Sequence, residues 1–131
     1  MNAEMAEGAF TDLLARRKNF IEVVAALLEA RVRSYEVDFV ARRLMLYGED
    51  GSHHAVAIEV PADLAPSEFF SSGAIDRTIM RMRGPDADYA TFLQGMMQAG
   101  CAQYFVYLRG RRAIYLGVDG DQHVVQIPAR L

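Results

Sequence analysis

Two histidines stand at the same place in two copies of one short phrase, and they are the first candidates for chemistry. The phrase reads YGEDGSHH at residues 47–54 and LGVDGDQH at residues 116–123. His54 and His123 end the two copies. A histidine changes its charge near neutral pH, so the pair could share a catalytic site, or each could close its own hairpin with a hydrogen bond. No HxH, HExxH or CxxC spacing is present, so we expect no metal and no cofactor.

A carboxylate and two tyrosines complete a candidate pocket with these histidines. Asp38 lies within the apolar stretch SYEVDFV at residues 34–40. A carboxyl buried on such a strand could act as an acid or base, although it could equally be an exposed residue or bond a neighbour. Tyr35 recurs as Tyr104 in the second half of the chain. We therefore name one candidate pocket, formed by His54, His123, Asp38, Tyr35 and Tyr104.

Arginine pairs also recur, and they form a separate candidate site for anions. The pairs are Arg42-Arg43 and Arg111-Arg112. Guanidinium groups bind oxyanions through two parallel hydrogen bonds, so phosphate is a suitable ligand. Alternatively, the charges solvate hairpins and protect strand edges from aggregation. A net charge of −3 argues against broad contact with nucleic acid.

An internal repeat explains why these residues occur twice. At an offset of 69, residues 20–58 align without a gap with residues 89–127, and eleven of the 39 pairs are identical. Ordinary residue usage would give about two or three identities. We predict a single α+β domain of two α-α-β-β-β repeats, at about 1–61 and 71–128, joined by a proline-containing loop at 61–70.

The elements follow from apolar periodicity and turn residues. Apolar residues spaced by three and four predict helices over 4–17, 20–28, 71–83 and from Pro85-Asp86 to Gly100. Strands are expected at 34–40, 43–48, 54–60, 103–108, 111–117 and 122–127. These strands form antiparallel hairpins, and the helices should cover the sheet. Gly100 is a left-handed helix cap, and the first repeat has Arg31 in its place.

Asp-Gly pairs set the register of two hairpins. Read as a two-residue type I′ turn, Asp50-Gly51 places Tyr47 opposite His54. Asp119-Gly120 is the same turn in the second repeat. His54 would then share a face with Met45 and Tyr47. By the same reasoning, His123 would share a face with Ile114 and Leu116.

Composition limits the class of protein. Of 131 residues, 52% are apolar, which is ample for one core. No apolar run approaches the roughly 20 residues that cross a bilayer. The acidic N-terminus lacks the basic region of a signal peptide, and a single cysteine excludes an internal disulfide framework. We expect a soluble cytoplasmic protein that does not bind membranes.

Two segments resemble a known family of small bacterial proteins. They are SYEVDF at residues 34–39 and AGCAQYFVYLRGRRAIYLGVDGDQHV at residues 99–124. With the preceding DYATFLQGMMQAG, they are similar to the domain of unknown function 1398 family, some of whose members are labelled phage-envelope-like. The resemblance covers about residues 10–128 and departs from the family at Arg31, where a glycine is typical. It implies no activity, cofactor or catalytic residue.

Two functions compete on this basis. Residues 104–108 and 113–116 are apolar on both sides of their strands, so the face away from the helices needs a second cover. This pattern favours a non-enzymatic binding or protein-interaction domain, and a homodimer would supply the cover. The alternative is an enzyme or small-molecule-binding protein with a pocket at the pseudo-two-fold axis between the repeats.

Overall fold

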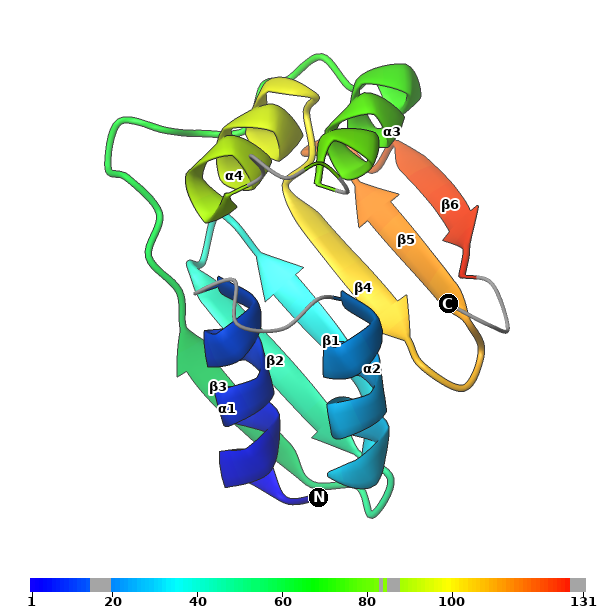
Figure 1. The fold of residues 1–131 in the computed structure, drawn as a ribbon. Helices are drawn as coiled ribbons and strands as arrows, with labels where there is room; N and C mark the ends of the chain where they lie inside the picture. Colours follow the sequence, from blue (N-terminus) through cyan, green and yellow to red (C-terminus); the bar gives the residue numbers. More distant parts are fainter. Residues whose placement is uncertain (15–19, 83, 85–87, 128–131) are drawn as a thin grey trace.

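The fold is α+β, with four helices and one six-stranded antiparallel sheet over the residues described (Figure 1). A computed structural model of the chain describes residues 1–14, 20–82, 84 and 88–127. In chain order the elements are α1 (Ala3–Leu14), α2 (Phe20–Glu29), β1 (Val32–Asp38), β2 (Arg43–Gly48), β3 (His53–Ala57), α3 (Ser72–Arg81), α4 (Tyr89–Gln98), β4 (Gln103–Tyr107), β5 (Arg112–Leu116) and β6 (Gln122–Gln126). The expected helical residues 15–17, 83 and 85–86, and the expected repeat end at 128, lie outside the described residues.

The strand order is β3-β2-β1-β4-β5-β6, so each half of the chain contributes three adjacent strands. The halves join where β1 pairs with β4, and β3 and β6 form the two edges. Glu36 of β1 pairs directly with Phe105 of β4, and these two residues are 69 positions apart. An axis that relates positions 69 apart therefore passes between Glu36 and Phe105.

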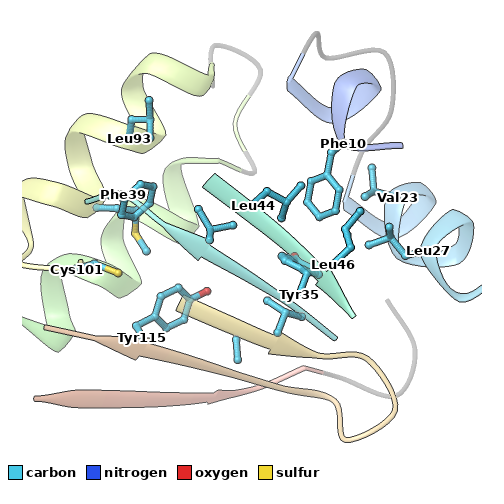
Figure 2. Packing of buried hydrophobic residues seen from close by; sticks show 14 of the residues in the cluster. Phe10, Val23, Leu27, Tyr35, Phe39, Leu44, Leu46, Leu93, Cys101 and Tyr115 are labelled. Carbon is cyan, nitrogen blue, oxygen red and sulfur yellow. The ribbon is translucent and has the colours of Figure 1, made fainter. Parts of the chain in front are cut away.

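Alternate strand residues pack with the helices into one hydrophobic core (Figure 2). Figure 2 shows Phe10 of α1 beside Tyr35 of β1, and the rings of these residues meet edge to face with centroids 4.8 Å apart. We call this side of the sheet the inner face. Its members in the core include Tyr35, Val37, Leu44, Leu46, Val106, Ala113 and Tyr115. Side chains alternate along a strand, so the intervening residues form the outer face.

Equivalent positions in the two halves adopt the same unusual backbone. Positive φ angles occur at Arg31 (65°) and Gly100 (88°), which lie 69 residues apart. The same offset relates Arg42 to Arg111 and Gly51 to Gly120, which all have positive φ. The cap predicted at Gly100 is confirmed. Arg31 adopts the same left-handed conformation even though an arginine is strained there.

The two Asp-Gly hairpins differ from the prediction by one residue. In the first, the Gly51 N–H donates to the Gly48 carbonyl, and the Gly48 N–H donates to the Ser52 carbonyl. Only Gly51 has positive φ, which identifies a three-residue loop with a type I turn rather than a type I′ turn. The Ser52 hydroxyl and backbone N–H donate to the Asp50 carboxylate and hold its pKa well below the usual range.

This loop changes the neighbours of both histidines. His54 lies opposite Leu46, and His123 lies opposite Tyr115. The predicted pairing of Tyr47 with His54 is wrong, because Tyr47 pairs with His53. His54 therefore shares the inner face with Leu44 and Leu46, and His123 shares it with Ala113 and Tyr115. The extra loop residue causes the shift, since each added residue displaces the register by one.

Candidate functional site

Each repeated histidine contacts a carboxylate on the first helix of its own half. His54 Nε2 lies 3.6 Å from Glu7 Oε2 on α1. His123 Nε2 lies 2.8 Å from Asp76 Oδ1 on α3. Glu7 and Asp76 are themselves 69 positions apart, so both halves join an edge strand to a helix in the same way. Neither acid was predicted from the sequence to contact a histidine, although the offset that relates the two histidines also relates the two acids.

The structure does not bring the two histidines together. His54 lies on β3 and His123 on β6, the opposite edges of the sheet. Five inter-strand spacings of about 4.8 Å place these strands roughly 24 Å apart. A general base must lie within hydrogen-bond reach of its substrate, so no single small molecule can contact both imidazoles in this fold. A shared catalytic pair is therefore not formed.

Asp38 has a structural role at the end of β1. Only 6% of the residue is exposed. One carboxylate oxygen accepts hydrogen bonds from the backbone N–H groups of Val40 and Ala41, both at 2.9 Å. The other oxygen accepts from Gln103 Nε2 at 3.1 Å. These bonds satisfy the buried carboxylate and fix the turn into β2, as expected for a buried polar group.

Of the two candidate tyrosines, Tyr35 is buried in the core, and Tyr104 is half-buried and packs against it. The rings of Tyr35 and Tyr104 meet edge to face with centroids 6.4 Å apart. Tyr104 also contacts Tyr115, with centroids at 5.4 Å. Burial raises the pKa of Tyr35, of Tyr104 and of Tyr115 above the usual value, with smaller repulsive contributions from their ionisable neighbours. These hydroxyls are therefore kept protonated and are poor general bases.

The arginine pairs lie at opposite ends of the sheet. Arg42 and Arg43 follow β1, whereas Arg111 and Arg112 follow β4, which runs antiparallel to β1. The Arg42 guanidinium donates a hydrogen bond from Nη1 to the Val60 carbonyl at 3.1 Å, so it supports the chain after β3. The four arginines therefore do not converge on one anion.

A cluster of charges that was not predicted from the sequence joins the two halves at one end. The Glu49 carboxylate contacts Arg109 Nη2 at 2.6 Å and Arg31 Nη1 at 3.5 Å. Arg109 belongs to the β4–β5 turn and Glu49 to the β2–β3 turn. The equivalent of Glu49 in the second half is Val118, which is 48% exposed. The sequence indicated this cluster only through the difference between an acidic residue at position 49 and an apolar residue at position 118.

A groove of about 780 Å³ lies beside α4. Its walls include Ile58, Val60, Leu64 and Leu93, with Tyr89 and Glu59 among the polar groups. Burial and the nearby Glu59 carboxylate raise the pKa of Tyr89 to about 12. Of the residues named as candidates above, Arg42 alone appears in this lining. The groove is thus separate from the predicted pocket.

The possible metal ligands and the single thiol are further candidates for chemistry among the described residues. The described part of the chain contains no group of three or more His, Cys, Asp or Glu side chains arranged to hold a metal ion. Cys101 is fully buried, and its thiol donates to the Gln103 carbonyl at 3.3 Å. Burial raises the pKa of Cys101 to about 12, which opposes formation of the reactive thiolate.

The outer face of the sheet carries an apolar patch on its second half. We define the outer-face patch as Phe105, Tyr107, Ile114 and Val124. Tyr107 is 40% exposed and Val124 is 43% exposed, and the other two are half-buried. None of the four belongs to the hydrophobic core or packs against it. The equivalents in the first half are Glu36, Asp38, Met45 and Ala55, so the apolar character is concentrated over β4, β5 and β6.

No protein-family model matches the chain, and a search of curated proteins gives no significant match. The resemblance to the domain of unknown function 1398 family therefore stays a prediction. Among the described residues, no helix has both the length and the apolar character needed to span a bilayer.

Proposed function

We propose that this chain is a non-enzymatic protein-interaction domain that binds its partner through the outer face of the sheet. The single observation that carries the proposal is the outer-face patch. An exposed face of an antiparallel sheet normally carries polar residues, because one face packs on the core while the other meets water. Phe105, Tyr107, Ile114 and Val124 occupy such positions instead, and contiguous apolar patches mark interaction sites.

The proposed architecture agrees with this use of the sheet. We infer that an α-α-β-β-β unit was duplicated, since matching helices, strands and positive φ angles recur at one offset. In this architecture the four helices cover the inner face and leave the outer face for a partner. The chemistry-bearing residues support the same conclusion, because His54, His123 and Asp38 all have local partners that account for them.

Site-specific photo-crosslinking tests the proposal. A photoreactive phenylalanine analogue replaces Val124 on the outer face, and in a matched control it replaces Met80, an exposed apolar residue of α3. Irradiation of cells that produce each variant should give a discrete covalent adduct from position 124 and none from position 80. The proposal fails if position 124 gives no adduct, or if both positions give the same adducts.

A further inference from the structure

An unpaired carboxylate lies at the centre of the outer face. Glu36 is half-buried between Met45 of β2 and Phe105 of β4. Within the part of the chain that the structure describes, its side chain forms no ion pair and no hydrogen bond. A partner that covered this position with apolar atoms alone would bury an uncompensated charge, at a large cost. A cation of the partner opposite Glu36 would compensate that charge.

The same face carries an unpaired cation in a complementary place. Arg112 lies on the outer face of β5 and is exposed, and among the described residues its guanidinium has no acidic partner. Glu36 pairs across the sheet with Phe105, and Arg112 pairs with Tyr107, from the other side of β4. Two strand spacings and a two-residue step separate the charges by roughly 12 Å, which is too far for an ion pair within one chain.

The midpoint between these charges coincides with the aromatic part of the patch. It lies on β4 between Phe105 and Tyr107, whose rings stack with centroids 6.4 Å apart and an interplanar angle of 13°. Consider a second copy placed face to face, with the two-fold axis over this midpoint, parallel to the sheet and perpendicular to the line that joins Glu36 to Arg112. That rotation exchanges positions on either side of the axis. Each Glu36 then lies opposite Arg112 of the partner subunit, and the aromatic pairs meet at the centre.

We propose that the partner on the outer face is a second copy of this chain, held by two reciprocal Glu36–Arg112 ion pairs around a core of Phe105 and Tyr107. The proposal rests on the proposed function and names its partner. An isologous two-fold interface requires a surface that complements itself, which the opposite charges on either side of β4 provide. Aromatic residues at the centre and charged pairs around them are the usual arrangement of an interface.

The outer face is large enough for such a dimer. Six strands at about 4.8 Å spacing and five residues at about 3.3 Å each give roughly 29 by 17 Å, or about 500 Å² in projection. Side chains that stand on this surface increase its accessible area towards the roughly 800 Å² per partner of a standard interface. The buried area therefore reaches that of a standard dimer interface only when the partner covers most of the outer face.

Charge reversal with a mixing step tests the inference. Sedimentation equilibrium should show that the wild-type chain dimerises. Glu36→Arg and Arg112→Glu should each weaken self-association at least about tenfold, because like charges then face each other. An equimolar mixture of the two variants should form heterodimers with nearly wild-type affinity, because each dimer then has one native Glu36–Arg112 pair and one pair with the charges exchanged. Arg77→Glu is the control, because Arg77 is an exposed arginine of α3, which packs on the core side of the sheet away from the outer face. It should leave the dimer unchanged.

The mixing step keeps the test valid if a variant is impaired by itself. Circular dichroism identifies a variant that does not fold, and Glu36→Gln then serves as the milder substitution, with a smaller loss of affinity expected. A wild-type monomer at micromolar concentration overturns the inference, and so does a mixture that fails to form heterodimers from folded variants. If either of these results is obtained but position 124 crosslinks to a different protein, the proposed interaction through the outer face still holds and only the self-association is wrong. If position 124 gives no adduct at all, the proposed function and the self-association are both wrong.

Discussion

At the scale of single residues, the repeated histidines act locally. His54 with Glu7 and His123 with Asp76 each connect an edge strand to the first helix of the same half. The side chain of His54 is 37% exposed and that of His123 is 21% exposed, so solvent screens both contacts. The sequence identified these histidines as special, but their partners lie 47 residues away in each half. Only folding brings the carboxylates to them.

Substitution of the two histidines tests whether they act independently. His54→Ala and His123→Ala should each lower the free energy of unfolding by at most about 1 kcal/mol, because partly exposed contacts of this kind contribute little. The double variant should equal the sum of the single effects to within about 0.5 kcal/mol, because the sites lie on opposite edges. Urea denaturation at neutral pH measures all three. A coupling above about 1 kcal/mol would show that the histidines share a site, and His53→Ala on the outer face is the control.

At the scale of elements, the lengths and conformations of the connections set the strand register and the helix ends. The Asp-Gly phrase predicted a hairpin correctly, but it did not predict the length of the loop. A three-residue loop has positive φ at glycine alone, and it shifted the register by one residue. The end of α4 was predicted correctly, because Gly100 follows the last apolar position of this helix and has the expected positive φ. Its start was not, since α4 begins at Tyr89 after the N-cap Asp88 rather than at Pro85-Asp86.

Equivalent helix ends in the two halves should respond in opposite directions to substitution. A Cβ atom on Gly100 would lie 2.5 Å from the Phe69 carbonyl oxygen, so Gly100→Ala should cost at least about 2 kcal/mol of unfolding free energy. Arg31→Gly should stabilise the protein by about 1 kcal/mol or less, because it removes the strain of a left-handed arginine at the expense of one exposed ion pair. Thermal and urea denaturation measure both changes. Destabilisation by Arg31→Gly would contradict the strain argument.

At the scale of the whole molecule, three tyrosines from both halves keep their hydroxyl protons as long as the chain is folded. Tyr35, Tyr104 and Tyr115 form a continuous ring cluster across the central strands. Burial raises the pKa of each hydroxyl in the folded state above its value in the unfolded chain. Above about pH 10 the unfolded chain loses these protons while the folded chain retains them, so the unfolded state becomes more favourable. Stability conferred by the neutral hydroxyls is fully present below that pH.

Alkaline titration should therefore unfold the molecule cooperatively. Stability should fall as the pH rises above about 10, and these three tyrosines should ionise only as the chain unfolds. Ultraviolet absorbance of tyrosinate and circular dichroism, recorded together, should show coincident transitions. The triple variant Tyr35→Phe, Tyr104→Phe and Tyr115→Phe should have a weaker pH dependence. Ionisation of all tyrosines before any loss of structure would contradict the buried cluster.

The sequence by itself determined the α+β class, most element positions, the Gly100 cap and the correspondence between residues 69 positions apart. These features depend on periodicity and local backbone conformation, which are read along the chain. The tertiary structure alone decided which repeated residues meet. Because β1 and β4 join the halves in antiparallel orientation, the equivalent histidines and arginines are carried to opposite edges and ends of the sheet. The same pairing places Glu36 beside Phe105 at the centre of the outer face. Phe105 belongs to the apolar stretch 104–108 that the sequence already indicated, whereas Glu36 was identified only from the tertiary structure.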